Sequence, residues 1–163
     1  MAKEILHLGE RKMIGQVSEL LEIAMNREIV SQAFYIAGQK QAADPGVRQL
    51  MAEMAADEGK HLESIRALKE EGLTDRDWVP ENVPNLMISE YLVDTTLSEG
   101  ATMQDVLTLA MKREQQSVEF YSRMMSVMKR KATKLLCEKL VHAELKHKMK
   151  LEIFYDDLFY KEN

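Results

Sequence analysis

AMNREIVSQAFY at residues 24–35 and AMKREQQSVEFY at residues 110–121 are two copies of one segment, 86 positions apart. The sequences EGKH at 58–61 and ELKH at 144–147 stand at the same offset. An internal repeat of this kind predicts two structural units of one design. The identical residues of the longer segment are Ala24/Ala110, Met25/Met111, Arg27/Arg113, Glu28/Glu114, Ser31/Ser117, Phe34/Phe120 and Tyr35/Tyr121.

Both copies lie in stretches that are suited to long helices. The chain has only seven Gly and three Pro, which leaves long segments without a helix breaker. Asp44-Pro45-Gly46 predicts a turn, because it combines a capping side chain, a fixed φ and a permissive glycine. Thr102 followed by Asp105 predicts a helix start. We therefore expect an all-α protein with helices over about 15–41, 47–71, 102–129 and 132–160, and a crossover over about 73–100 that contains a short helix near 85–97.

The spacing of the repeated glutamates indicates how these helices pair. Glu28 precedes Glu58 by 30 residues, and Glu114 precedes Glu144 by the same number. The midpoint of the first pair lies beside the predicted turn, so both glutamates stand at one height in an antiparallel hairpin. The second midpoint predicts a turn at residue 129, where neither Gly nor Pro marks one. The expected fold is a four-helix bundle of two repeated antiparallel hairpins joined by the long crossover.

Charged residues interrupt the apolar face of each predicted helix. Apolar residues recur every three or four positions on the fourth helix, and Glu144 and His147 occupy two positions of that stripe. Glu58 and His61 do the same on the second helix, and one glutamate does so on each remaining helix. Unpaired buried charges are costly, so positive charge must lie among these carboxylates. The basic residues next to these positions in sequence face other directions on their helices: Arg27, Lys60, Arg113 and Lys146.

We therefore expect two metal ions inside the bundle. Two divalent cations balance four carboxylates, and two imidazoles complete an oxygen-rich ligand set that suits iron or manganese. One Glu from each of two helices, with Glu-x-x-His from each of the other two, is the pattern of di-iron carboxylate bundles. Iron is the expected metal, with manganese or zinc as alternative occupants. The predicted ligands are Glu28, Glu58, His61, Glu114, Glu144 and His147.

Several neighbouring residues are predicted to have supporting or passive roles. Tyr35 and Tyr121 lie two helical turns beyond the glutamates of their own helices, so we expect them to donate hydrogen bonds to ligating carboxylates and to be available as electron sources. Asp57 has Ala143 as its counterpart in the repeat, which favours a surface charge. Cys137, the single cysteine, excludes an internal disulfide and is expected to be an inert thiol.

Composition bounds the remaining function classes. The 163 residues suit one domain over 1–163. A formal net charge of -5 gives no general attraction to nucleic acid. No stretch of about 18 apolar residues occurs, so we expect no membrane span and a cytoplasmic location.

At these residues the sequence resembles the rubrerythrin branch of the ferritin-like superfamily, over nearly the whole chain. The resemblance implies a ferritin-like bundle in which Glu58 and Glu144 bridge two irons. It also implies reduction of hydrogen peroxide and assembly into homodimers or larger homo-oligomers. Rubrerythrins usually carry a further Glu at the position of Ser117 and a rubredoxin domain with four cysteines, and neither feature is present here. An external electron donor, such as a rubredoxin-like protein, is therefore expected.

Three functions compete at this point. The favoured one is a di-iron oxidoreductase that reduces hydrogen peroxide. The first alternative is a ferroxidase or iron-binding protein of bacterioferritin type, in which Fe(II) is the substrate. The second alternative is a non-catalytic helical bundle that metal stabilises.

Overall fold

The structure, a computed structural model, describes residues 2–72 and 97–161, with side chains described from residue 19 onward. Within these ranges the chain is all-α, as predicted. The expected short helix near 85–97 falls almost entirely on residues outside the described ranges. The helices are α1 (Ala2–Gln41), α2 (Pro45–Glu70), α4 (Met103–Val127) and α5 (Lys131–Phe159).

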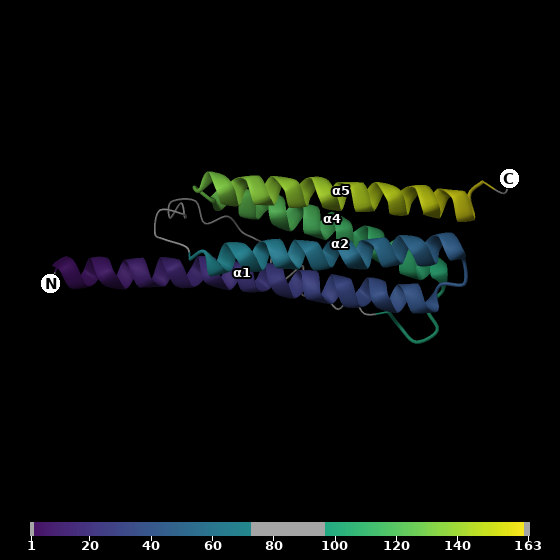
Figure 1. The fold of residues 1–163 in the computed structure, drawn as a ribbon, viewed down its shortest axis with the longest axis horizontal. Coiled ribbons are helices and arrows are strands. Elements are labelled where there is room, and N and C mark those ends of the chain that lie inside the picture. Colours follow the sequence, from purple (N-terminus) through teal and green to yellow (C-terminus); the bar gives the residue numbers. More distant parts are fainter. Residues whose placement is uncertain (1, 73–96, 162–163) are drawn as a thin grey trace.

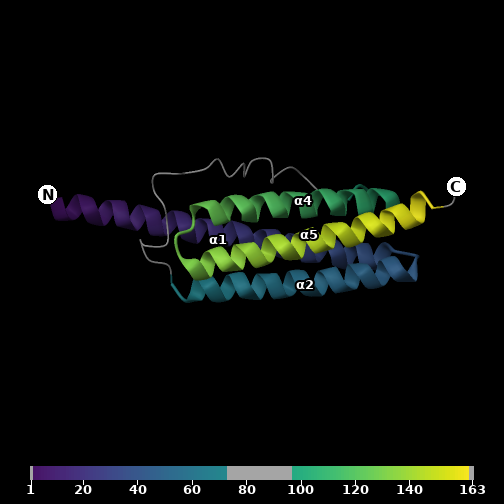
Figure 2. The same ribbon diagram turned by 90° about the horizontal axis from the view of Figure 1, so that it is seen from above.

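The helices form two antiparallel hairpins, α1 with α2 and α4 with α5, that pack side by side (Figures 1 and 2). Across the bundle, α2 lies beside α5 and α1 lies beside α4. Each hairpin is packed closely within itself, whereas its contact with the other hairpin is looser. The two seams between the hairpins, α1/α4 and α2/α5, are therefore the places where side chains or open space separate the helices. No helix within the described ranges is long and apolar enough to cross a membrane.

The predicted turns and caps are present. The Asp44 side chain accepts a hydrogen bond from the Val47 amide at 2.9 Å, and Pro45 occupies the first turn of α2. Thr102 and Asp105 form a capping box at the start of α4. The α4/α5 turn lies between Val127 and Lys131, so the turn inferred at residue 129 from spacing alone is confirmed.

The first helix is longer than predicted, because it begins at Ala2 and not near Gly15. Residues 2–14 contain no proline and a single glycine, Gly9, which one helix tolerates at modest cost. Figure 1 shows the N-terminal part of α1 extending past the ends of the other helices.

Two apolar clusters fill the bundle, one toward each end. The first surrounds Leu21, Ile65 and Met124, and the second surrounds Met51, Met54 and Leu107. Residues of the predicted inward stripes belong to both clusters, among them Leu21, Ile65, Met54 and Leu107. Cys137 belongs to the first cluster, and burial raises the pKa of its thiol to about 12, in agreement with an inert residue.

Candidate metal centre

All six predicted ligand residues meet in the core, between the two apolar clusters. The four carboxylates are each at most 2% exposed, and His147 is 4% exposed. Each helix contributes from the level set by the repeat, so the equal spacing of the glutamates does place them at one height. The contributing residues are Glu28 from α1, Glu58 and His61 from α2, Glu114 from α4, and Glu144 and His147 from α5.

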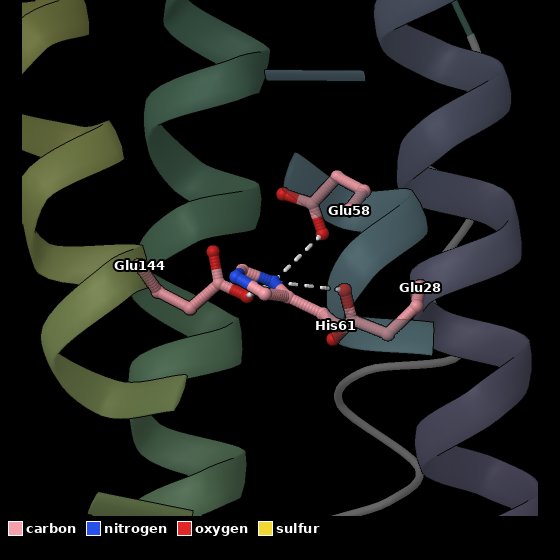
Figure 3. A group of neighbouring side chains, drawn as sticks. All are labelled: Glu28, Glu58, His61 and Glu144. Atoms are coloured by element: carbon pink, nitrogen blue, oxygen red, sulfur yellow. Dashed lines mark ion pairs between the residues drawn. The ribbon is translucent and has the colours of Figure 1, made fainter. Parts of the chain in front are cut away.

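His61 is the centre of the first of two groups of donor atoms. Its Nδ1 atom lies 3.3 Å from Glu144 Oε1, 3.4 Å from Glu28 Oε2 and 3.6 Å from Glu58 Oε2. Figure 3 shows these side chains converging on one point from α1, α2 and α5. The donor atoms of this group all lie within 4.8 Å of one another, which is close enough for a single ion to reach all four residues.

His147 is the centre of a second group with the same plan. Its Nδ1 atom lies 3.2 Å from Glu144 Oε2, 3.3 Å from Glu58 Oε1 and 3.6 Å from Glu114 Oε2. Glu58 and Glu144 thus direct one oxygen to each group, whereas Glu28 and Glu114 each belong to one group only. This is the geometry that two bridging and two terminal carboxylates require.

The inward-facing atoms of the centre fit metal ions. Among the described residues, seven buried atoms of these six side chains have no hydrogen-bond partner. Unsatisfied buried polar groups are rare because each loses its interactions with water, so a set of seven that faces one space calls for a ligand. The set combines oxygen and imidazole nitrogen, as iron and manganese sites do. The atoms are Glu28 Oε2, Glu58 Oε1, His61 Nδ1, Glu114 Oε2, Glu144 Oε1 and Oε2, and His147 Nδ1.

The four carboxylates divide into two kinds when no metal is bound. Burial raises the pKa of Glu28 and of Glu114 well above the ordinary value, so these two hold a proton. Burial also opposes ionisation of Glu58 and Glu144, but close polar contacts with neighbouring groups, both histidines among them, outweigh it and lower their pKa. The bridging positions are therefore ionised and the terminal positions are neutral.

The two imidazoles are protonated in the metal-free protein. Burial alone would lower the pKa of each ring, but the surrounding carboxylates outweigh it and raise the pKa of His61 to about 12. The pKa of His147 is raised for the same reason. Two imidazolium ions and two neutral carboxyls give the centre the same net charge as two divalent cations with all six groups deprotonated.

Each tyrosine that was predicted to support the centre does contact a terminal carboxylate. The Tyr35 hydroxyl donates a short hydrogen bond to Glu114 Oε1, and the Tyr121 hydroxyl donates one to Glu28 Oε1. The bonds cross between hairpins, because each tyrosine holds the glutamate of the other repeat. Burial, and next the adjacent glutamate, raises the pKa of both tyrosines, so they remain neutral donors.

The α1/α4 seam is closed by two crossed pairs that were not predicted. Arg27 Nη2 donates to Ser117 Oγ at 3.0 Å, and Arg113 Nη2 donates to Ser31 Oγ at 2.9 Å. Both serines are buried, and Arg113 is only 9% exposed. Both arginines therefore join α1 to α4 beside the centre, a role that the sequence did not indicate. Ser117, where rubrerythrins usually have glutamate, is the acceptor of one pair.

Asp57 has a contact that the sequence interpretation did not expect. Its side chain is 38% exposed, as a surface charge would be, but its Oδ2 atom also lies 3.2 Å from Nε2 of His147 on α5. Burial would raise the pKa of Asp57, but Lys60 and His147 outweigh it and lower the pKa, so the carboxylate is ionised. Residue 57 precedes an inward ligand and therefore lies on the flank of α2 that faces α5. That position on the helix was the signal available in the sequence. It was overlooked because the equivalent residue of the other repeat is Ala143.

The α2/α5 seam is open where the α1/α4 seam is closed. A hollow of about 460 Å³ lies over the outer edges of both imidazoles, and the side chain of His61 is 12% exposed there. Asp57 and Ala143 lie on opposite sides of it. The rest of the lining comes from α5, namely Lys139, His142, Lys146 and Lys150. Two arginine–serine pairs thus span one side of the centre, and the hollow borders the other.

Comparison with known proteins places this geometry in a family. A sequence model described as Rubrerythrin matches residues 19–155, which include every residue of the centre. The chain belongs to the rubrerythrin family. Family membership supports a di-iron protein, in agreement with the two groups of donor atoms. A search of curated proteins found no match.

Solved structures confirm a ferritin-like fold. The dodecameric thioferritin of Bacteroides fragilis, a bacterioferritin-related protein, aligns with a TM-score of 0.67 and 17% identity over 89% of this chain and 87% of that one. A two-domain Anabaena variabilis protein, with a DJ-1/ThiJ/PfpI-like and a ferritin-like domain, aligns with a TM-score of 0.70 and 16% identity. In that case 90% of this chain matches 41% of the other.

Proposed function

We propose that this chain is a non-haem di-iron oxidoreductase that reduces hydrogen peroxide with electrons from an external donor. The observation that carries the proposal is the pair of donor groups around His61 and His147, which share Glu58 and Glu144. In this assignment Glu58 and Glu144 would be shared by the two metals, while Glu28 and Glu114 would each hold one. Iron is the proposed metal because of the oxygen-rich ligand set and the family.

When bound, two irons supply one electron each, and two electrons with two protons convert one peroxide molecule to two water molecules. The protein orients the ligand side chains and keeps them buried from water. Tyr35 and Tyr121 keep one oxygen of Glu114 and of Glu28 occupied, which leaves the other oxygen aimed inward. The arginine–serine pairs span the α1/α4 seam, and the hollow that His61 borders offers access on the α2/α5 side.

The charge around the hollow favours peroxide over Fe(II) as the substrate that enters there. Lys139, Lys146 and Lys150 oppose the approach of a dication, whereas neutral hydrogen peroxide meets no such barrier. A ferroxidase function is the second candidate. The observation in its favour is the fold shared with the bacterioferritin-related protein of Bacteroides fragilis, whose dodecameric state also leads us to propose that this chain forms homo-oligomers.

The test is a peroxide titration of iron-loaded, reduced protein under anaerobic conditions. We expect one peroxide to be consumed for each pair of irons, with the appearance of a diferric absorption band. Loss of less than a stoichiometric amount of peroxide, with no band, would refute the peroxidase function. Continued oxidation of added Fe(II) well beyond two per chain would favour the ferroxidase function in its place.

A further inference from the structure

The outer face of α5 carries a row of lysines along the edge of the hollow. Lys139, Lys146 and Lys150 all belong to the lining, and Lys139 and Lys146 are exposed. Lys150, about half exposed, also lies 3.7 Å from Glu53 on α2. The only carboxylate of the lining, Asp57, is already engaged by Lys60 and His147. Three lysines thus outnumber one carboxylate among the residues that line the hollow, although the chain has a formal net charge of -5.

The shape of the row fits a protein surface better than a small anion. From Lys139 to Lys150 the helix rises by about 16 Å, which is several times the size of a phosphate or carboxylate group. A built anion site would use arginine forks or backbone amides that converge on one point. Lysines are flexible and strongly hydrated point charges, which suit a transient electrostatic contact.

Apolar side chains accompany the lysines on the same face. Leu145, Met149 and Ile153 follow one another at steps of four residues and are 44%, 54% and 51% exposed. Met149 lies three residues after Lys146, and Ile153 lies three residues after Lys150, so these apolar and cationic side chains are neighbours on the surface of α5. Protein interfaces combine an apolar centre with a charged rim in this way. An apolar contact also has no use in the binding of a small inorganic anion.

We propose that this face of α5, with the hollow beside it, docks a carboxylate-rich electron-carrier protein against the edge of His61. The inference rests on the proposed function, because peroxide reduction needs two electrons from outside the chain. Two one-electron deliveries by such a partner supply them. Docking here places the partner over a ring that belongs to the centre, whereas the α1/α4 seam is closed by Arg27 and Arg113.

The experiment measures binding of a recombinant rubredoxin, a small acidic iron–sulfur carrier, to the full chain without metal. The test variant is Lys139→Glu with Lys146→Glu. The matched control is Lys112→Glu with Lys134→Glu, which removes two exposed lysines outside the hollow and changes the net charge equally. We expect the dissociation constant to rise with added NaCl, to rise about tenfold or more in the test variant, and to stay near the wild-type value in the control.

Equal weakening in both variants would show that only net charge matters and would overturn the proposal, as would no binding by the wild type. Sedimentation of each protein tests whether a second copy of this chain occupies the face instead. A test variant that loses its oligomeric state but keeps the rubredoxin affinity would assign the face to self-association and also overturn the proposal. Failure of the proposed function is separate, since it would appear as no peroxide loss by iron-loaded protein with an uncharged hydroquinone as reductant.

Discussion

The two hairpins contribute matching sets of ligands but unequal surroundings. Asp57 of the first hairpin bonds the outer nitrogen of His147, while its counterpart Ala143 offers His61 no carboxylate. His147 is thereby held in one orientation with Nδ1 aimed inward, and the outer edge of His61 borders the hollow. A repeat can thus keep every donor atom and still build two inequivalent metal positions, because one neighbouring residue differs.

The largest expected effect comes from a residue that both donor groups share. Glu144→Gln keeps the shape of the side chain but removes its charge and replaces one of its two oxygens with an amide nitrogen, so one donor group loses a ligand atom and the other keeps a neutral carbonyl oxygen. We expect bound iron to fall from about two per chain to well below one after reconstitution and desalting, because one position loses a ligand atom and both lose the negative charge of a shared carboxylate. Elemental analysis measures the ratio. Retention of two irons would mean that Glu144 does not bridge.

Replacing one histidine should divide the centre into its halves. His147→Ala is expected to leave one metal per chain, held by the group around His61, and His61→Ala is expected to leave one in the other group. Each variant still has three carboxylate ligands at the intact position. Titration with Co(II), followed by its visible absorption, separates one equivalent from two. Loss of both metals in either variant would show that the two positions fill only as a unit.

The number of protons released on metal binding tests the protonation states assigned to the metal-free centre. Metal must displace protons from His61, His147, Glu28 and Glu114, so we expect close to four protons released per two ions at neutral pH. Affinity should therefore fall as the pH falls, by about 100-fold per ion for each pH unit at two protons per ion. Titration in dilute buffer with a pH indicator counts the protons. Release of one proton or none would contradict the assigned protonation.

A smaller effect should come from the residue that distinguishes the halves. Asp57→Asn weakens the contact that orients His147, so we expect a loss of roughly 10-fold to 100-fold in affinity at that position only. Ala143→Asp gives His61 the missing partner and is the matched change in the other half. Competition with a chelator measures the stepwise dissociation constants of the two positions. We expect the difference between these two constants to change in each variant. An equal loss at both positions in Asp57→Asn would remove the assigned asymmetry.

The sequence was sufficient for features that depend on spacing along one helix or across one hairpin. Glu28 and Glu58 could be placed at one height because the turn lies midway between them, and the turn at residue 129 followed from the same rule. Contacts across the seams between the hairpins could not be predicted from the sequence. Arg27 with Ser117 and Asp57 with His147 join helices of different hairpins, and no spacing rule states which flank of a helix faces which neighbour. The role of the six residues as metal ligands stays a prediction until metal is measured.

Sharing Glu58 and Glu144 between both donor groups has a further consequence. Neither hairpin alone holds a complete set of donor atoms, so the centre is complete only when the two hairpins pack together. Two identical chains, each with one such hairpin, would supply the same donor atoms by twofold symmetry, but every substitution would then appear twice. Because both hairpins belong to one chain, residue 57 can differ from residue 143. One side of the centre can then have a polar approach, while the histidine on the other side has a supporting carboxylate.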